Sequence, residues 1–105
     1  MENEDRRYIV SISDKASEML VSHARFLANV SEEAAKNLIE DFKLSARSLE
    51  IFPDRNPWLS DSAMPLNKYR KLLFRKRFLL IYLIKQDSIY IEYIVDCRQD
   101  YKWLL

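Results

Sequence analysis

The amino-acid sequence predicts an α+β domain in which an antiparallel helical hairpin packs on one face of a small antiparallel sheet. Three observations predict it. An N-terminal segment is rich in β-branched and aromatic residues, two amphipathic segments with helical spacing follow, and the last third of the chain has two-residue periodicity. The resulting order, β-α-α-β-β-β, is typical of a two-layer fold. With 105 residues the chain is expected to be a single domain, residues 1–105.

The first strand is predicted from Tyr8 to Ile12, with alternate residues on one face. Ser13 then provides an N-cap for a first helix, and Ser31 provides one for a second helix. Each helix carries an apolar stripe, and helices joined by so short a connection are expected to form an antiparallel hairpin. The two stripes comprise Ala16, Met19, Leu20, His23, Leu27 and Val30 in the first helix, and Ala35, Leu38, Ile39, Phe42, Ala46 and Leu49 in the second.

The second helix is expected to end at Phe52, because Pro53 disfavours helix at the residue before it. An irregular loop with two further prolines follows. The remaining segments are joined by turns so short that neighbouring strands must be antiparallel. These predicted strands are Tyr69–Phe74, Phe78–Ile84 and Ser88–Val95.

Composition excludes several classes of protein. Cys97 is the single cysteine, so the chain has no internal disulfide and no zinc-type ligand set. The chain has no glycine, which excludes the phosphate-binding loops of P-loop and dinucleotide-binding proteins. The charged N-terminal residues are unlike a signal peptide, and the longest apolar stretch, Phe78–Ile84, is too short to span a bilayer. We expect a soluble, cytoplasmic protein without membrane association, cofactor or metal.

The segment Lys68–Lys85 concentrates positive charge. It carries seven of the seventeen Lys and Arg residues and no Asp or Glu, although the formal net charge of the chain is only +1. One interpretation is a surface that binds nucleic acid or an acidic partner. The other is that the charges solubilise a strand and its exposed turn. We favour the binding surface, which comprises Lys68, Arg70, Lys71, Arg75, Lys76 and Arg77.

Other candidate residues have weaker support. His23 lies in an apolar stripe without a partner to orient it, so a packing role is favoured over general base catalysis. After the last strand, Arg98 is a candidate to hold a phosphate, and Tyr101 or Trp103 to stack on a base. Equally, the C-terminal apolar residues could cap the core, with Arg98 paired to Asp96 or Asp100.

The chain resembles the RelE/ParE superfamily, the toxins of bacterial type II toxin–antitoxin modules, over nearly its whole length. The resemblance rests on YIVSISDKASEML, which opens the helical hairpin, and on the LxxFPDRNP-like turn at Leu49 to Pro57. It also rests on YRKLLFRKRFLLIYLI followed by IYIEYIVDCRQD. The resemblance implies the same α+β fold, growth inhibition and a cognate antitoxin as partner.

The superfamily implies two alternative activities. RelE-like members are mRNA interferases that cut messages on the ribosome without a metal, and ParE-like members inhibit DNA gyrase. By resemblance, Arg70 and Arg98 match basic positions of the nucleases, and Tyr101 is an imperfect substitute for their C-terminal Tyr. However, Leu79 stands where those nucleases have Arg, and Leu72 where they have a second Lys.

These departures favour a ParE-like toxin that is gyrase-directed or non-catalytic. A RelE-like nuclease with a rearranged basic site, or a non-toxic RNA-binding module, remains the alternative. If the chain is a nuclease, its candidate catalytic residues are Arg70, Arg98 and Tyr101.

Overall fold

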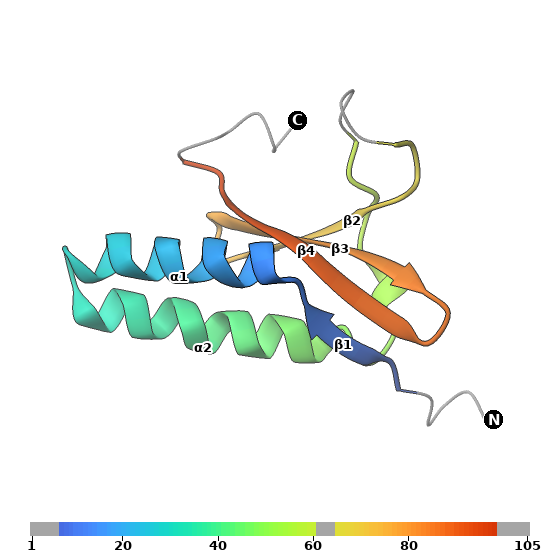
Figure 1. Cartoon of the computed structure of the whole chain (residues 1–105), viewed down its shortest axis with the longest axis horizontal. Coiled ribbons are helices and arrows are strands. Elements are labelled where there is room, and N and C mark those ends of the chain that lie inside the picture. The colour runs from blue at the N-terminus through green and yellow to red at the C-terminus, as the bar shows by residue number, and fades with distance from the viewer. Residues whose placement is uncertain (1–6, 61–64, 99–105) are drawn as a thin grey trace.

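The computed structural model of the chain describes residues 7–60 and 65–98. Strand β1 (Ile9–Ile12) leads into helix α1 (Asp14–Ala28), which is followed by helix α2 (Glu32–Ser48). The two helices form a hairpin that covers one face of the sheet (Figure 1). The predicted α+β fold is therefore confirmed.

Serine residues begin both helices, as the sequence predicts. The Oγ of Ser13 accepts a hydrogen bond from the backbone N–H of Ala16 at 3.0 Å, and the Oγ of Ser31 accepts one from that of Ala34 at 3.1 Å. Each bond satisfies a backbone donor that has no partner within the helix. Val30, which we placed in the first apolar stripe, is 81% exposed because it lies beyond the end of α1 at the tip of the hairpin.

A short 3-10 helix, Pro53–Arg55, precedes three further strands, β2 (Arg70–Phe74), β3 (Phe78–Lys85) and β4 (Ser88–Asp96). The strand order across the sheet is β1-β4-β3-β2. The last three strands are antiparallel neighbours, but β1 pairs with β4 in parallel. The sheet is therefore mixed rather than wholly antiparallel. A short turn fixes the direction of each later strand, whereas β1 is joined to the rest through the helical hairpin and is free of that constraint.

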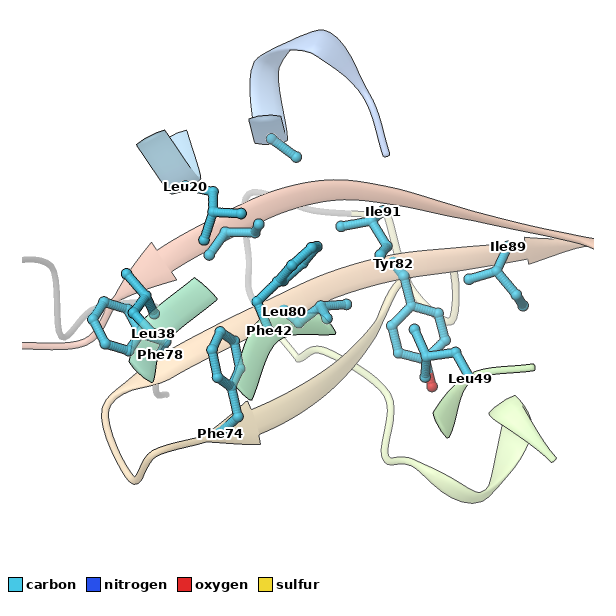
Figure 2. Packing of buried hydrophobic residues seen from close by; sticks show 12 residues of the cluster. Leu20, Leu38, Phe42, Leu49, Phe74, Phe78, Leu80, Tyr82, Ile89 and Ile91 are labelled. Carbon is cyan, nitrogen blue, oxygen red and sulfur yellow. The ribbon is translucent and has the colours of Figure 1, made fainter. Parts of the chain in front are cut away.

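The main core lies between the helices and the sheet. Leu38 and Phe42 of α2 meet Phe74, Phe78 and other side chains of the sheet in Figure 2. Phe42 and Phe74 have ring centroids 6.4 Å apart, and Phe74 stacks on Phe78 at 5.7 Å. Aromatic pairs at these distances add to the stabilisation that comes from burial alone.

A β-bulge in β4 sets which side chains face the helices. Ile81 pairs with Tyr93 while Tyr82 pairs with Ile91, so Glu92 is an extra residue on β4. Because of the bulge, Ile94 lies on the helix-covered face together with Ile91. The Oγ of Ser13 donates to the Glu92 carbonyl at 3.3 Å, which joins the start of α1 to the bulge.

The other face of the sheet carries a second apolar cluster. Leu79, Ile81 and Val95 are each at most 3% exposed there, and Met19 is the residue of α1 that packs against this cluster. Leu59 from the loop before β2 is packed into this cluster, and its N–H donates to the Tyr69 carbonyl at 2.7 Å. Strand β3 is therefore buried on both faces.

Neither helix in residues 7–60 and 65–98 combines the length and apolar character needed to cross a membrane. The same residues contain no group of three or more His, Cys, Asp and Glu side chains placed to hold a metal ion.

Candidate functional site

Arg70, the first residue of β2, lies against the loop before the strand. Its Nη1 donates to the Asn56 carbonyl at 2.6 Å, and its guanidinium carbon lies 3.7 Å from the centre of the Trp58 ring. Its Nε is buried and has no partner among the described residues. Stacking on an aromatic face and a bond to a backbone carbonyl are typical of an Arg that stabilises local structure. Arg70 thus joins β2 to the loop.

The same region holds a buried tyrosine that the sequence did not identify as important. Tyr82 of β3 is fully buried, and its hydroxyl donates to the Pro53 carbonyl at 2.5 Å and accepts from the Asn56 amide at 3.0 Å. Desolvation by burial raises the pKa of the Tyr82 hydroxyl, although the Asn56 bond opposes this. The loop that contains Pro53 and Asn56 is therefore held to the sheet by its hydrogen bonds with Tyr82 and Arg70.

Two arginines of the β2–β3 turn form ion pairs. The Nη1 of Arg75 lies 2.6 Å from a carboxylate oxygen of Asp41 on α2, in a partly exposed pair. Arg77 bonds both carboxylate oxygens of Asp96, with its Nε at 3.0 Å and its Nη2 at 2.8 Å. Only 3% of Asp96 is exposed. Both arginines are thus already paired with carboxylates of the same chain.

The Arg77–Asp96 pair has a third member. The backbone N–H of Arg98 donates to Oδ1 of Asp96 at 3.0 Å, so the carboxylate also fixes the end of β4. Desolvation is the largest influence on this carboxyl and would raise its pKa. The hydrogen bonds from Arg77 and the Arg98 N–H, together with the Arg77 charge, outweigh it and hold the pKa of Asp96 below its ordinary value.

The remaining cations of the predicted surface form no ion pair with any carboxylate in the described part of the chain. Lys68 is exposed, with its Nζ 5.2 Å from the Tyr69 ring centre. Lys76 and Arg98 are also exposed, and Lys71 is half-buried. Of the predicted surface, Lys68, Lys71 and Lys76 are therefore available to meet an external anion, and so is Arg98 beyond it.

The predicted cationic residues do not converge on one point. Arg70 is paired with Tyr82, whereas Phe78, four residues earlier on β3, is paired with Asp96. At the ordinary rise of a strand, Arg70 and the Asp96–Arg98 corner are separated by roughly 14 Å along the sheet. The strand register therefore separates the backbone of Arg70 from that of Arg98, and Asn56 and Trp58 hold the Arg70 guanidinium. Tyr101, the third candidate catalytic residue, lies outside the described residues, as does Trp103.

His23 and Cys97 have structural surroundings. The Nε2 of His23 lies 2.8 Å from the Ile94 carbonyl, and because a carbonyl only accepts, this nitrogen carries the proton. The His23 ring also packs against Phe78, with centroids 5.5 Å apart. Cys97 is buried, and desolvation raises the pKa of its thiol, which disfavours the nucleophilic thiolate.

One of the two interpretations of the C-terminal segment paired Arg98 with Asp96 or Asp100, and neither interpretation included the bond between Asp96 and the Arg77 side chain. A signal was present, because counting back from the two-residue turn after Lys85 places Asp96 opposite Arg77, and the bulge at Glu92 shifts this register by only one residue, to Phe78. Arg70 was assigned to an anion surface because its sequence neighbours are basic. Only the folded loop shows that Trp58 and Asn56 occupy its guanidinium.

Comparisons with known proteins identify the fold. No family model matches the chain, and no curated protein sequence does. Among solved structures, it is similar to a chain from the "Chromosomal ParDE TA system from P. aeruginosa", with a TM-score of 0.68. The two are 17% identical, and the match covers 88% of this chain and 98% of that chain. The ParE-like fold that the sequence resemblance implied is thereby confirmed.

Proposed function

We propose that this protein is the growth-inhibiting toxin of a bacterial type II toxin–antitoxin module, and that it acts in the ParE-like manner, without cutting RNA. The fold shared with a chain of a ParDE TA system supports the general class. One observation supports the ParE-like assignment over the nuclease. Arg70, Arg75 and Arg77 of the basic segment already contact other residues of the same chain.

Metal-free RNA cleavage makes three chemical demands. The 2′-hydroxyl must lose its proton, the pentacovalent phosphate must be stabilised, and the leaving oxygen must gain a proton. At the central position where a cleaving relative has Arg, this chain has Leu79, which is 2% exposed. Losing one such stabilising donor typically slows a reaction on the order of 100-fold. The separation of Arg70 from Arg98 adds to this cost.

One observation favours the alternative, a RelE-like nuclease with a rearranged site. Lys71 lies on the face of the sheet away from the helices, and Arg98 is exposed at the end of β4. Neither has a carboxylate partner in the described part of the chain. These two cations are therefore the residues to substitute when the two activities are compared.

The test is induced expression in bacteria, with message cleavage and plasmid supercoiling measured in the same cultures. We expect growth arrest and altered supercoiling while messages stay intact. A Lys71→Ala/Arg98→Ala variant is expected to lower message cleavage only if the protein is a nuclease. Cuts at ribosome-positioned sites that disappear in this variant would refute the ParE-like assignment. Expression without growth arrest would refute the toxin assignment itself.

A further inference from the structure

Among the described residues, only the first half of the outer edge of β2 has a pairing partner. β2 is the last strand of the sheet, and Pro57–Leu59 runs antiparallel to its beginning. The N–H of Lys71 donates to the Pro57 carbonyl at 3.0 Å. Beyond Lys71 no described residue continues this pairing, so the second half of the edge is open.

The open half of the edge presents unused backbone groups. Because strand residues alternate in direction and the N–H of Lys71 points outward to Pro57, the N–H and carbonyl of Leu73 also point outward. No residue in the described part of the chain pairs with them. An exposed edge of this kind is a template for an added strand.

A hollow of about 250 Å³ lies beside this edge. Lys71, Leu73 and Leu79 line it, and Asn56 and Pro57 close it where the chain's own pairing stops. Leu79 is 2% exposed, whereas Leu73 is 49% exposed. The hollow thus offers apolar side chains next to free backbone groups, which suits one apolar side chain of an extended peptide.

The charges around the open edge favour a partner that carries carboxylates. Lys71 lines the hollow, exposed Lys76 lies in the adjoining turn, and the sequence from Lys68 to Lys85 contains no carboxylate. A second copy of this chain is disfavoured, because two-fold pairing of β2 edges about Leu73 would place Lys71 of one copy opposite Arg75 of the other. Like charges directly opposite each other destabilise paired strands. The edge therefore suits an acidic partner.

We propose that the open edge of β2 at Leu73 binds an extended segment of the cognate antitoxin. The segment adds as a strand beside Leu73, places one apolar side chain in the hollow and brings a carboxylate to Lys71. This inference rests on the proposed toxin function, because the partner is the antitoxin of that module.

The test uses the purified full-length chain and the antitoxin, identified as the co-encoded protein whose co-expression restores growth. Leu73→Pro removes the outward N–H but leaves the hydrogen bonds that join β2 to β3, so the sheet is preserved. Leu73→Ala removes the side chain and keeps the N–H, and Lys71→Glu reverses the charge. Leu44→Ala and Lys43→Glu, on the exposed outer side of α2, are the matched controls.

We expect each β2 variant to raise the calorimetric Kd roughly tenfold, as the loss of one hydrogen bond or charged contact does, and the α2 controls to change it less than twofold. Hydrogen exchange provides a second measurement. The Leu73 amide is expected to exchange rapidly in the free protein and to be protected in the complex. Circular dichroism of each variant confirms that the fold is retained.

Three outcomes would overturn the proposal. If the antitoxin binds and restores growth but neither the Kd nor the Leu73 amide responds, the edge is not its site, and the toxin function stands. If Leu73→Pro instead dissolves a homodimer seen by sedimentation, the edge joins two copies. If it instead weakens binding to a single-stranded RNA, the edge serves nucleic acid. Failure of the proposed toxin function itself would be recognised separately, because cells that express the protein without any antitoxin would then grow normally.

Discussion

At the scale of single residues, Arg77 forms an ion pair with Asp96 that stabilises the fold, although the sequence predicted that Arg77 lies on an anion-binding surface. Arg77 belongs to the basic turn, yet its guanidinium bonds both oxygens of a carboxylate that is almost fully buried. The same carboxylate accepts the Arg98 N–H. A buried pair is costly to break, because removal of one partner leaves an uncompensated charge. The local role of Arg77 is thus to neutralise Asp96 and hold the end of β4.

We predict that Asp96→Asn lowers the free energy of unfolding by about 3 kcal/mol at neutral pH, since it leaves Arg77 without its charged partner. The folded-state pKa of Asp96 is depressed, so its stabilisation is present above the unfolded pKa of about 4 and is lost as pH falls through the lower folded-state value. The difference in the free energy of unfolding between wild type and variant should therefore shrink below about pH 4. Urea unfolding at pH 7 and pH 3 measures it.

Arg75→Ala is the control for this prediction, because it removes a partly exposed pair with Asp41. Such pairs contribute at most about 1 kcal/mol. If Asp96→Asn costs no more than Arg75→Ala, or if its cost is unchanged at pH 3, the Asp96 carboxylate does not stabilise the fold as described.

At the scale of elements, the turn between β2 and β3 is unusual in its residues. The chain has no glycine, and both Arg75 and Lys76 have positive φ, at 54° and 55°. Arg75 and Lys76 are the central residues of a turn closed by a hydrogen bond from the Arg77 N–H to the Phe74 carbonyl. Such positions strongly prefer Asn and Gly, because other side chains are strained in the left-handed region. Long cationic residues therefore occupy positions that local preference disfavours.

We predict that Lys76→Gly raises the free energy of unfolding by about 1 kcal/mol, because glycine adopts positive φ without the clash of a Cβ atom. Lys76→Ala removes the same charge but keeps the Cβ atom, so the comparison isolates the backbone contribution. The urea midpoints of the two variants provide the measurement. Equal stability of the two variants would show that the turn is not strained at Lys76.

At the scale of the whole molecule, the sheet has two buried faces but only one layer of helices. The helices cover the face that carries Leu80 and Tyr82, while the loop residue Leu59 packs over the face that carries Ile81. Leu80 and Ile81 are both 0% exposed. The proline-rich loop therefore acts as a partial third layer, and Arg70 and Tyr82 hold it there.

We predict that Ile81→Ala destabilises the protein by about 2–5 kcal/mol, as much as Leu80→Ala does, because each leaves a cavity in a closed cluster. Equilibrium urea unfolding compares the two. Leu73→Ala on the same face as Ile81 is the matched control, since Leu73 is half exposed and should cost much less. A cost below about 1 kcal/mol for Ile81→Ala would show that the loop does not close this face.

Local signals in the sequence were sufficient for most of the fold. Ser13 and Ser31 are N-caps in the structure, and the helical stripes apart from Val30 and Ala35 contact the core. The short turns required antiparallel pairing, which the structure has. The parallel pairing of β1 was not predictable in the same way, because no short connection links it to its neighbour.

The candidate site was less predictable than the fold. The sequence identified the basic segment and the replacement of a cleaving Arg by Leu79, and these still define where function is to be sought. It could not show which cations are free. Arg77 and Asp96 are 19 residues apart and Arg70 and Asn56 are 14 apart, so their pairing depends on strand register and loop packing.

The sequence by itself thus determined the elements, their order and the concentration of charge, because caps, periodicity and turns act over a few residues. The tertiary structure alone decided that the arginines Arg70, Arg75 and Arg77 are bound within the protein, and that no residue in its described part pairs with the edge at Leu73. Both depend on contacts between segments that are distant in the chain, and such contacts exist only once the sheet has its register and the loop is packed against it.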